Sequence, residues 1–218
     1  MRFFIWRKTI YPIPLNESAR LSALQHYNVL DTPGEAVFDD IVRLARDICG
    51  SQVSLISLID SDRQWFKAQI GLGELTETPR EQSFCAHAIM SDELFVVEDA
   101  SQDVRFRRNP LVIGSPNIRF YAAVPLTVAK DIRLGTLCVF GDTSGGVSAD
   151  QLRALLTLRD AAVAQLKLAY LESKLPLNVC AWCNQMLDDT RNGYFPNTSL
   201  ITHGICSECT SSVRSGLE

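Results

Sequence analysis

The sequence predicts an α+β domain with an antiparallel sheet, followed by a long helix and a small cysteine-rich module. The first observation is the order of the expected elements, in which runs of strands and helices are segregated rather than regularly alternating. The second is a helical pattern of about 26 residues that begins near residue 148 and would span about 39 Å. The third is that four of the seven cysteines fall after residue 179. These observations divide the chain into segments 1–15, 16–147, 148–175 and 176–218.

Two helices are expected to open the domain. In residues 17–30, apolar side chains recur at helical spacing. A second helix is expected to end at Gly50, because glycine adopts the left-handed conformation that terminates helices. Its start is expected at a capping box, with Thr32 as the cap, Pro33 in the first turn and Glu35 closing the box.

Short apolar segments rich in β-branched residues predict the strands. Residues 53–59 are apolar on both faces, which is typical of a central strand. The next strand, 65–70, is expected to place Phe66, Ala68 and Ile70 on one side. Further strands are expected at 95–97, 120–126 and 135–140, a helix at 83–90, a polar loop at 71–80 and irregular chain at 101–116.

The helix that begins near residue 148 has the start signal Ser148 with Gln151 three residues later, and Pro176 ends it. Its apolar stripe is wider than one buried face requires.

Composition excludes several classes of protein. The apolar fraction is 46%, the charged fraction 21% and the net charge −4, which are values of a globular chain without the basic excess of a nucleic-acid binder. No apolar run approaches the roughly 18 residues of a transmembrane helix, and the N-terminal apolar run is too short for a signal peptide. We expect a cytoplasmic protein with neither nucleic-acid nor membrane partners.

Several motifs occur in a fixed order in the first domain: REQSFCAHAI at 80–89, VVEDA at 96–100, IRFYAAVPL at 118–126 and LGTLCVF at 134–140. With the opening segment from Arg20 to Pro33, they resemble the GAF domain family over about residues 16–145. The resemblance is to the subgroup of sensory modules placed ahead of bacterial signalling enzymes.

This resemblance implies a six-stranded antiparallel sheet with helices on one face and a ligand cavity on the other. It also implies a homodimer, in which the long helix pairs with its twin and passes signals to an output. Each candidate cavity residue also has an alternative interpretation as ordinary core, cap or surface residue. The candidates are Phe84, Cys85, His87, Asp99, Phe120, Tyr121 and Cys138.

The expected function is that of a bacterial signalling sensor or adaptor that binds a small molecule or a protein partner. We expect no enzyme activity, because the 44 residues after Lys174 are too few for an output enzyme. One alternative is a thiol-based reductase of the free methionine sulfoxide type, using Cys49, Cys85 and Cys138. Others are bilin attachment at Cys85, for which the match is loose, and a dimeric scaffold whose cavity is filled by side chains.

The C-terminal cysteines form two C-x2-C pairs separated by 22 residues: Cys180 and Cys183, then Cys206 and Cys209. Two such pairs supply the four tetrahedral ligands of a structural zinc, and a segment with few large apolar residues needs a metal to fold. An iron–sulfur cluster and redox-active thiols are alternatives, and His203 could replace one cysteine ligand. The segment also resembles a short module found at the ends of bacterial sensor and receiver proteins.

Overall fold

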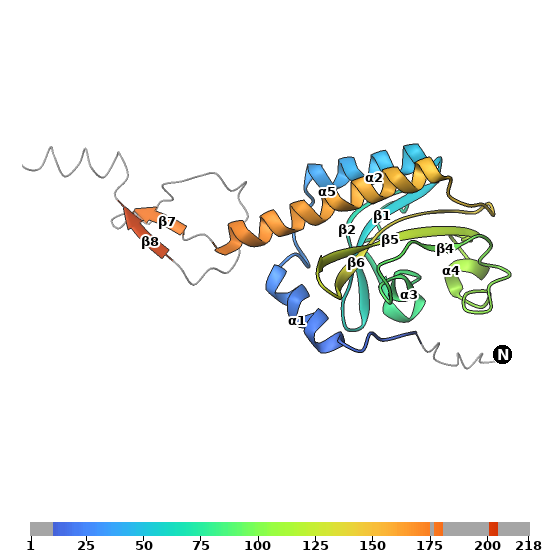
Figure 1. Cartoon of the computed structure of the whole chain (residues 1–218), viewed down its shortest axis with the longest axis horizontal. Coiled ribbons are helices and arrows are strands. Elements are labelled where there is room, and N and C mark those ends of the chain that lie inside the picture. Colours follow the sequence, from blue (N-terminus) through green and yellow to red (C-terminus); the bar gives the residue numbers. More distant parts are fainter. Residues whose placement is uncertain (1–10, 175–176, 181–200, 205–218) are drawn as a thin grey trace, which may run out of the picture. The chain divides into compact units, whose positions relative to one another are not determined.

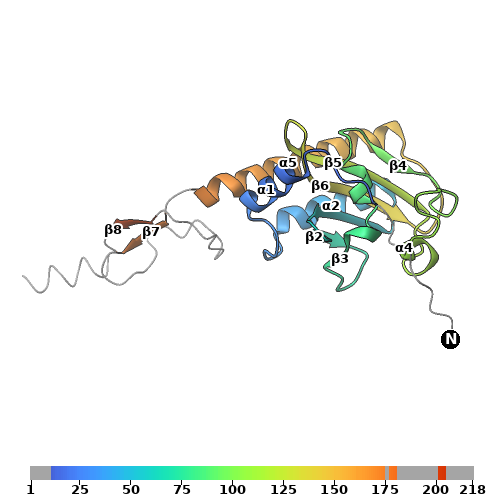
Figure 2. The ribbon, with the colours of Figure 1, turned by 90° about the horizontal axis from the view of Figure 1, so that it is seen from below.

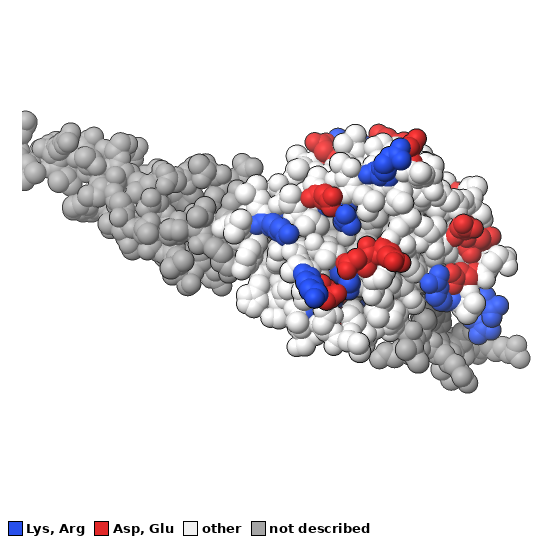
Figure 3. All heavy atoms as spheres, viewed as in Figure 1, with Lys and Arg blue, Asp and Glu red and all other residues white. Residues whose placement is uncertain are grey.

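The computed structural model describes residues 11–174, 177–180 and 201–204 (Figure 1). The chain divides into two compact units, with the boundary after Leu166. In the part that the structure describes, no helix is long and apolar enough to cross a membrane. On the face shown in Figure 3, basic and acidic side chains are interspersed.

The first unit is built on a six-stranded sheet, as predicted. The strand order is β3-β2-β1-β6-β5-β4, and every neighbouring pair is antiparallel. The strands are β1 (Val53–Ile59), β2 (Arg63–Ile70), β3 (Glu77–Pro79), β4 (Phe95–Val97), β5 (Phe120–Ala129) and β6 (Ile132–Gly141). The sequence did not predict β3, which lies in the expected loop 71–80.

Helices lie on both faces of this sheet (Figures 1 and 2). The three longer ones share one hydrophobic cluster with one face, and the short ones lie on the other. The longer helices are α1 (Glu17–Tyr27), α2 (Ala36–Cys49) and α5 (Ala149–Lys174), and the short ones are α3 (Cys85–Ala88) and α4 (Pro110–Ile113), preceded by a 3₁₀ turn (Arg80–Gln82). The prediction that helices occupy one face therefore holds only for the longer helices.

The sheet separates two hydrophobic clusters, because successive side chains of a strand point to opposite faces. The helix-side cluster includes Leu137 and Val139 of β6 together with Leu155 of α5. The pocket-side cluster includes Cys138 and Phe140 of the same strand. Strand β6 is thus in contact with a helix on one face and with the candidate site on the other.

The expectation that Phe66, Ala68 and Ile70 share one side of β2 is wrong. The register shifts between β1 and β2: Ala68 pairs with Ile56, but Phe66 pairs with Ser57. The extra residue is Lys67, so this is a β-bulge, and a bulge disrupts alternation. Phe66 joins the pocket-side cluster, whereas Ala68 joins the helix-side cluster.

Two predicted helix starts have different outcomes. The box at Ser148 is confirmed: its amide donates to Gln151 Oε1 at 2.9 Å, and its Oγ accepts from the Gln151 amide at 3.2 Å. The box at Thr32 is wrong, because α2 begins at Ala36 and the Thr32 hydroxyl donates to the Val29 carbonyl instead. Thr32 Oγ1 also accepts from the Lys67 ammonium at 2.6 Å, so a tertiary contact takes the place of the cap.

In the second unit, β7 (Leu177–Cys180) pairs in parallel with β8 (Ile201–Gly204), and Cys180 is opposite Gly204. Cys183, Cys206 and Cys209 lie outside the described residues. For Cys180 and His203 only the backbone is described. The metal site therefore stays a prediction.

Candidate functional site

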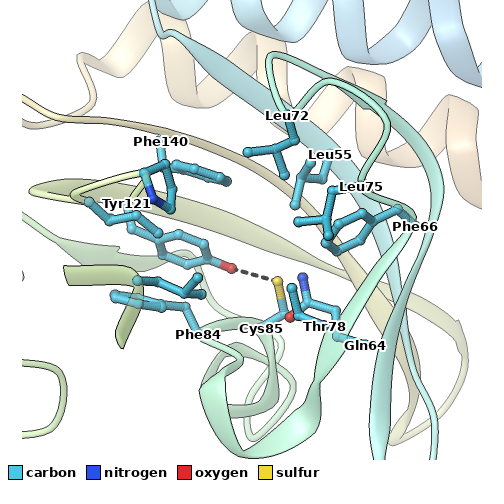
Figure 4. A pocket seen from close by; sticks show the side chains of 13 residues that line it. Leu55, Gln64, Phe66, Leu72, Leu75, Thr78, Phe84, Cys85, Tyr121 and Phe140 are labelled. Carbon is cyan, nitrogen blue, oxygen red and sulfur yellow. Dashed lines mark hydrogen bonds between the residues drawn. The ribbon is translucent and has the colours of Figure 1, made fainter. Parts of the chain in front are cut away.

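A small pocket opens on the sheet face opposite α2 and α5 (Figure 4). It has a volume of about 40 Å³, enough for about three water-sized molecules at 10–15 Å³ each. Strands β1, β2, β5 and β6 form its floor, and α3 and the neighbouring loops form its walls. Its lining consists of Leu55, Gln64, Phe66, Leu72, Leu75, Thr78, Phe84, Cys85, Leu111, Pro116, Ile118, Tyr121 and Phe140.

The sulfur of Cys85 lies at the polar end of this pocket. Cys85 is the first residue of α3, whose first turn is fixed by the Ala86 amide donating to Ser83 Oγ at 3.0 Å. A hydrogen bond of 3.0 Å joins its Sγ to the Tyr121 hydroxyl of β5, drawn as the dashed line in Figure 4. The Sγ of Cys138, on β6, lies 3.9 Å from that of Cys85.

Hydroxyl groups complete the surroundings of the two sulfurs. Ser57 of β1 and Thr136 of β6 are paired across the sheet, with their oxygens 3.3 Å apart. Burial raises the pKa of the Cys85 thiol, but hydrogen bonds from Cys138, Ser57, Thr136 and Tyr121 outweigh it and lower the pKa to about 6. Burial and the neighbouring Cys85 sulfur raise the pKa of Cys138. Of the two thiols, Cys85 is therefore the more acidic.

Gln64 and Thr78 add polar groups to the same pocket. Gln64 is only 5% exposed, and its side chain lines the pocket. Figure 4 draws its amide at the end of the pocket where Cys85 and Thr78 lie. The sequence analysis missed both residues. Gln64 lies one residue before the predicted strand 65–70, whereas the strand of the structure begins at Arg63, so the sequence offered no signal that this glutamine faces a pocket.

The structure brings together four of the seven residues proposed from sequence. Phe84, Cys85 and Tyr121 line the pocket, and Cys138 lies directly beside Cys85. Phe84 also stacks on Phe106, with ring centroids 3.9 Å apart.

The other three proposed residues lie elsewhere. Phe120 packs in the helix-side cluster, because it precedes Tyr121 on β5 and points to the opposite face. Asp99 accepts hydrogen bonds from the amide and hydroxyl of Ser101. His87 packs edge-on against Phe106, with centroids 4.8 Å apart, and does not line the pocket.

Comparison with known proteins identifies the domain. The model of the GAF domain family matches residues 33–166. The chain belongs to the GAF domain family. A cyclic di-GMP phosphodiesterase of Pseudomonas aeruginosa is 41% identical over 145 residues, which are 66% of this chain and 24% of that protein. This GAF chain therefore spans about a quarter of the length of the curated relative that it matches.

Solved structures with this fold come from proteins that are named for different activities. The GAF domain of a phosphoenolpyruvate-protein phosphotransferase from Coxiella burnetii superposes with a TM-score of 0.53 at 15% identity, covering 72% of this chain and 96% of that one. A free methionine-R-sulfoxide reductase from Neisseria meningitidis superposes with a TM-score of 0.50 at 17% identity, covering 76% and 99%. At such low identity these likenesses show the fold alone.

One expectation is corrected by these comparisons. The sequence analysis expected a protein without enzyme activity, from the length of chain after Lys174. The P. aeruginosa relative is named as an enzyme, and the solved structures of similar fold include a reductase. The length after Lys174 is no measure of activity, because the shared region is only about a quarter of the P. aeruginosa relative.

Proposed function

We propose that this GAF domain is a sensory domain that controls hydrolysis of cyclic di-GMP. The observation that carries the proposal is the 41% identity to a cyclic di-GMP phosphodiesterase over 145 residues of this chain. The pocket supports it by supplying a site at which a small molecule can act.

The pocket favours a small uncharged ligand. Its lining contains no Asp, Glu, Lys, Arg or His, and its polar groups are those of Gln64, Thr78, Cys85 and Tyr121. Ligand sites for drug-sized molecules occupy about 300–1,000 Å³, far more than the 40 Å³ available here. Cyclic di-GMP itself does not fit, so we assign it the role of substrate of the controlled activity.

Strand β6 offers a route from the pocket to α5. Cys138 is on its pocket face, and Leu137 and Val139 on its other face share a hydrophobic cluster with Leu155 of α5. Because packed cores have discrete arrangements, a ligand that shifts β6 biases the packing of α5. We propose that α5 pairs with the same helix of a second chain. Leu168 and Leu171, which are 47% and 61% exposed, would lie in that interface.

The test exchanges the corresponding region of the P. aeruginosa phosphodiesterase for residues 11–171 of this chain and measures hydrolysis of cyclic di-GMP. Leu111→Trp fills the pocket, and Val104→Trp adds the same bulk at an 81% exposed position outside it. We expect Leu111→Trp to change the rate about fivefold or more, and Val104→Trp to leave it unchanged. Equal rates for all three chimaeras would overturn the proposal.

A second candidate is a thiol-based reductase, favoured by the 3.9 Å separation of the Cys85 and Cys138 sulfurs. Its substrate would have to enter a cavity much smaller than a free amino acid requires, which makes this candidate the weaker one. Reduction of free methionine sulfoxide that survives Cys180→Ser but is lost in Cys85→Ser would establish it.

We also propose a structural zinc held by Cys180, Cys183, Cys206 and Cys209. The pairing of Cys180 with Gly204 supports it, since the first cysteine lies opposite a residue only two positions before Cys206 in the sequence. The module would support the protein's structure or a contact with a signalling partner.

A further inference from the structure

We infer that Cys85 and Cys138 form a peroxide-reactive dithiol, which a small hydroperoxide entering the pocket oxidises to a disulfide. The inference rests on the proposed sensory role of this pocket and names the chemical class that the pocket detects. It is argued from the sulfur pair, its hydrogen bonds and the shape of the pocket.

The two sulfurs are close enough to bond. They lie 3.9 Å apart, and a disulfide is about 2.05 Å long, so a displacement of about 2 Å joins them. Cys85 is carried by α3, a helix of only four residues, whereas Cys138 is held in a strand with partners on both sides. Movement of α3 towards the sheet is therefore the direct way to close this gap.

The surroundings favour a thiolate on Cys85. Its sulfur meets the Tyr121 hydroxyl at 3.0 Å, the Cys138 thiol and the hydroxyls of Ser57 and Thr136, all of which can donate to a negative sulfur. The thiolate is the nucleophilic form of cysteine. Burial instead raises the pKa of Cys49 to about 11, and no hydrogen bond to its sulfur is found among the described residues.

The pocket gives the two cysteines different roles. Cys85 lines it and Cys138 does not, so an entering oxidant meets Cys85 first. The side-chain amide of Gln64 and the hydroxyl of Thr78, which both line the pocket, can bind the peroxide oxygens. About 40 Å³ admits hydrogen peroxide but excludes an aryl hydroperoxide.

The reaction balances in two steps. The Cys85 thiolate attacks one peroxide oxygen: an S–O bond forms, the O–O bond breaks, and the departing oxygen takes the proton that Cys85 had released, leaving as water. The Cys138 sulfur then attacks the sulfur of the resulting sulfenic acid. The S–S bond forms, the S–O bond breaks, and the hydroxyl leaves with the Cys138 proton as a second water. Two thiols are oxidised and one hydrogen peroxide is reduced; an external dithiol reverses the change.

The test treats the full-length protein with hydrogen peroxide or, at equal concentration, cumene hydroperoxide. Free thiols are then alkylated in denaturant, and the peptides are identified by mass. We expect a Cys85–Cys138 linked peptide with hydrogen peroxide, little of it with cumene hydroperoxide, and its loss on treatment with dithiothreitol. If both cysteines stay fully alkylatable, or if both oxidants give the linked peptide equally, the inference is overturned.

Variants test the separate roles. Cys138→Ala should trap a sulfenic acid on Cys85, detected as a dimedone adduct, and Cys49→Ala should behave as the wild type. Tyr121→Phe keeps the ring but removes a hydrogen bond to the thiolate, so oxidation should slow roughly tenfold or more. Wild-type peptide mapping decides the outcome even if a core variant fails to fold.

The same samples separate this inference from the proposed function. The reaction of Cys85 and Cys138 with hydrogen peroxide is measured on the protein alone, whereas control of cyclic di-GMP hydrolysis is measured in the chimaera. A pocket variant that changes hydrolysis while Cys85 resists peroxide overturns the dithiol only. The opposite result is that the disulfide forms but hydrolysis by the chimaera does not change, and the pocket variants hydrolyse cyclic di-GMP at equal rates. That result overturns the sensory role only.

Discussion

Lys67 is a charged residue in the interior of the domain. Its side chain is 0% exposed, and its ammonium meets Glu35 Oε1 at 2.6 Å, Thr32 Oγ1 at 2.6 Å and the Pro33 carbonyl at 3.1 Å. The β-bulge directs it into these contacts, so one side chain ties β2 to the segment that precedes α2.

We predict that Lys67→Met destabilises the domain by about 2–3 kcal/mol, because hydrogen bonds to a buried charge are lost and their acceptors remain. The matched control is Arg43→Met, which removes an exposed ion pair with Asp40 (side chains 55% and 62% exposed). The control should cost less than about 1 kcal/mol. Urea unfolding measures both, and equal losses would contradict the structural role of Lys67.

His87 should make stability depend on pH. Burial, followed by the nearby positive charge of Arg105, lowers its pKa from 6.5 to about 4, although Asp103 acts in the opposite direction. The unfolded chain therefore binds a proton at a higher pH than the folded one. With respect to His87, the folded state has its full stability above about pH 6.5, and it loses part of this stability as the pH falls towards 4.

We expect His87→Phe to reduce this dependence. Phenylalanine keeps a ring against Phe106 but does not titrate. The difference in free energy of unfolding between wild type and variant should shift in favour of the variant between pH 7 and pH 4.5. Parallel curves over this interval would show that His87 is protonated equally in the folded and unfolded states.

At the scale of elements, the backbone of β1 leaves no room for a side chain at Gly135 of β6. A Cβ atom added at Gly135 would lie 1.8 Å from the Ser57 carbonyl oxygen, which is backbone and cannot move aside alone. This contact holds the two strands that carry Ser57, Thr136 and Cys138, so it sets the spacing of the hydroxyls around the sulfur pair.

We predict that Gly135→Ala costs about 3 kcal/mol or more in free energy of unfolding. Gly146→Ala is the control, because nothing lies within 4 Å of its added Cβ. That variant should stay within about 0.5 kcal/mol of the wild type. Thermal and urea unfolding compare the two, and a tolerated Gly135→Ala would show that the strands can separate without cost.

For the whole molecule, the metal prediction concerns the unit that begins after Leu166. Native mass spectrometry should find one zinc per chain, because two C-x2-C pairs make one tetrahedral site. Cys183→Ser should lose the metal, whereas Cys49→Ser should keep it. Since the GAF domain has its own core, its unfolding transition should survive treatment with a chelator. A metal-free mass, or iron in place of zinc, would contradict the prediction.

The sequence by itself determined where several of the elements begin and end. Helix α2 ends at Gly50 with φ +61°, and α5 begins at the Ser148 box, because these signals act between residues a few positions apart. The sequence also allows the prediction that Phe120 and Tyr121 point to opposite faces of the sheet, since neighbours on a strand face opposite sides. The prediction that both line the cavity did not take this alternation into account.

Only the tertiary structure decided the site. Cys85 and Cys138 are 53 residues apart, and neither has a local signal that points to the other. Their meeting depends on where α3 packs on the sheet, and the position of Phe66 in the same pocket depends on the bulge at Lys67. Local periodicity fixes which residues form a strand, whereas long-range packing fixes which strands and side chains meet. The reactive sulfur pair is a product of that packing.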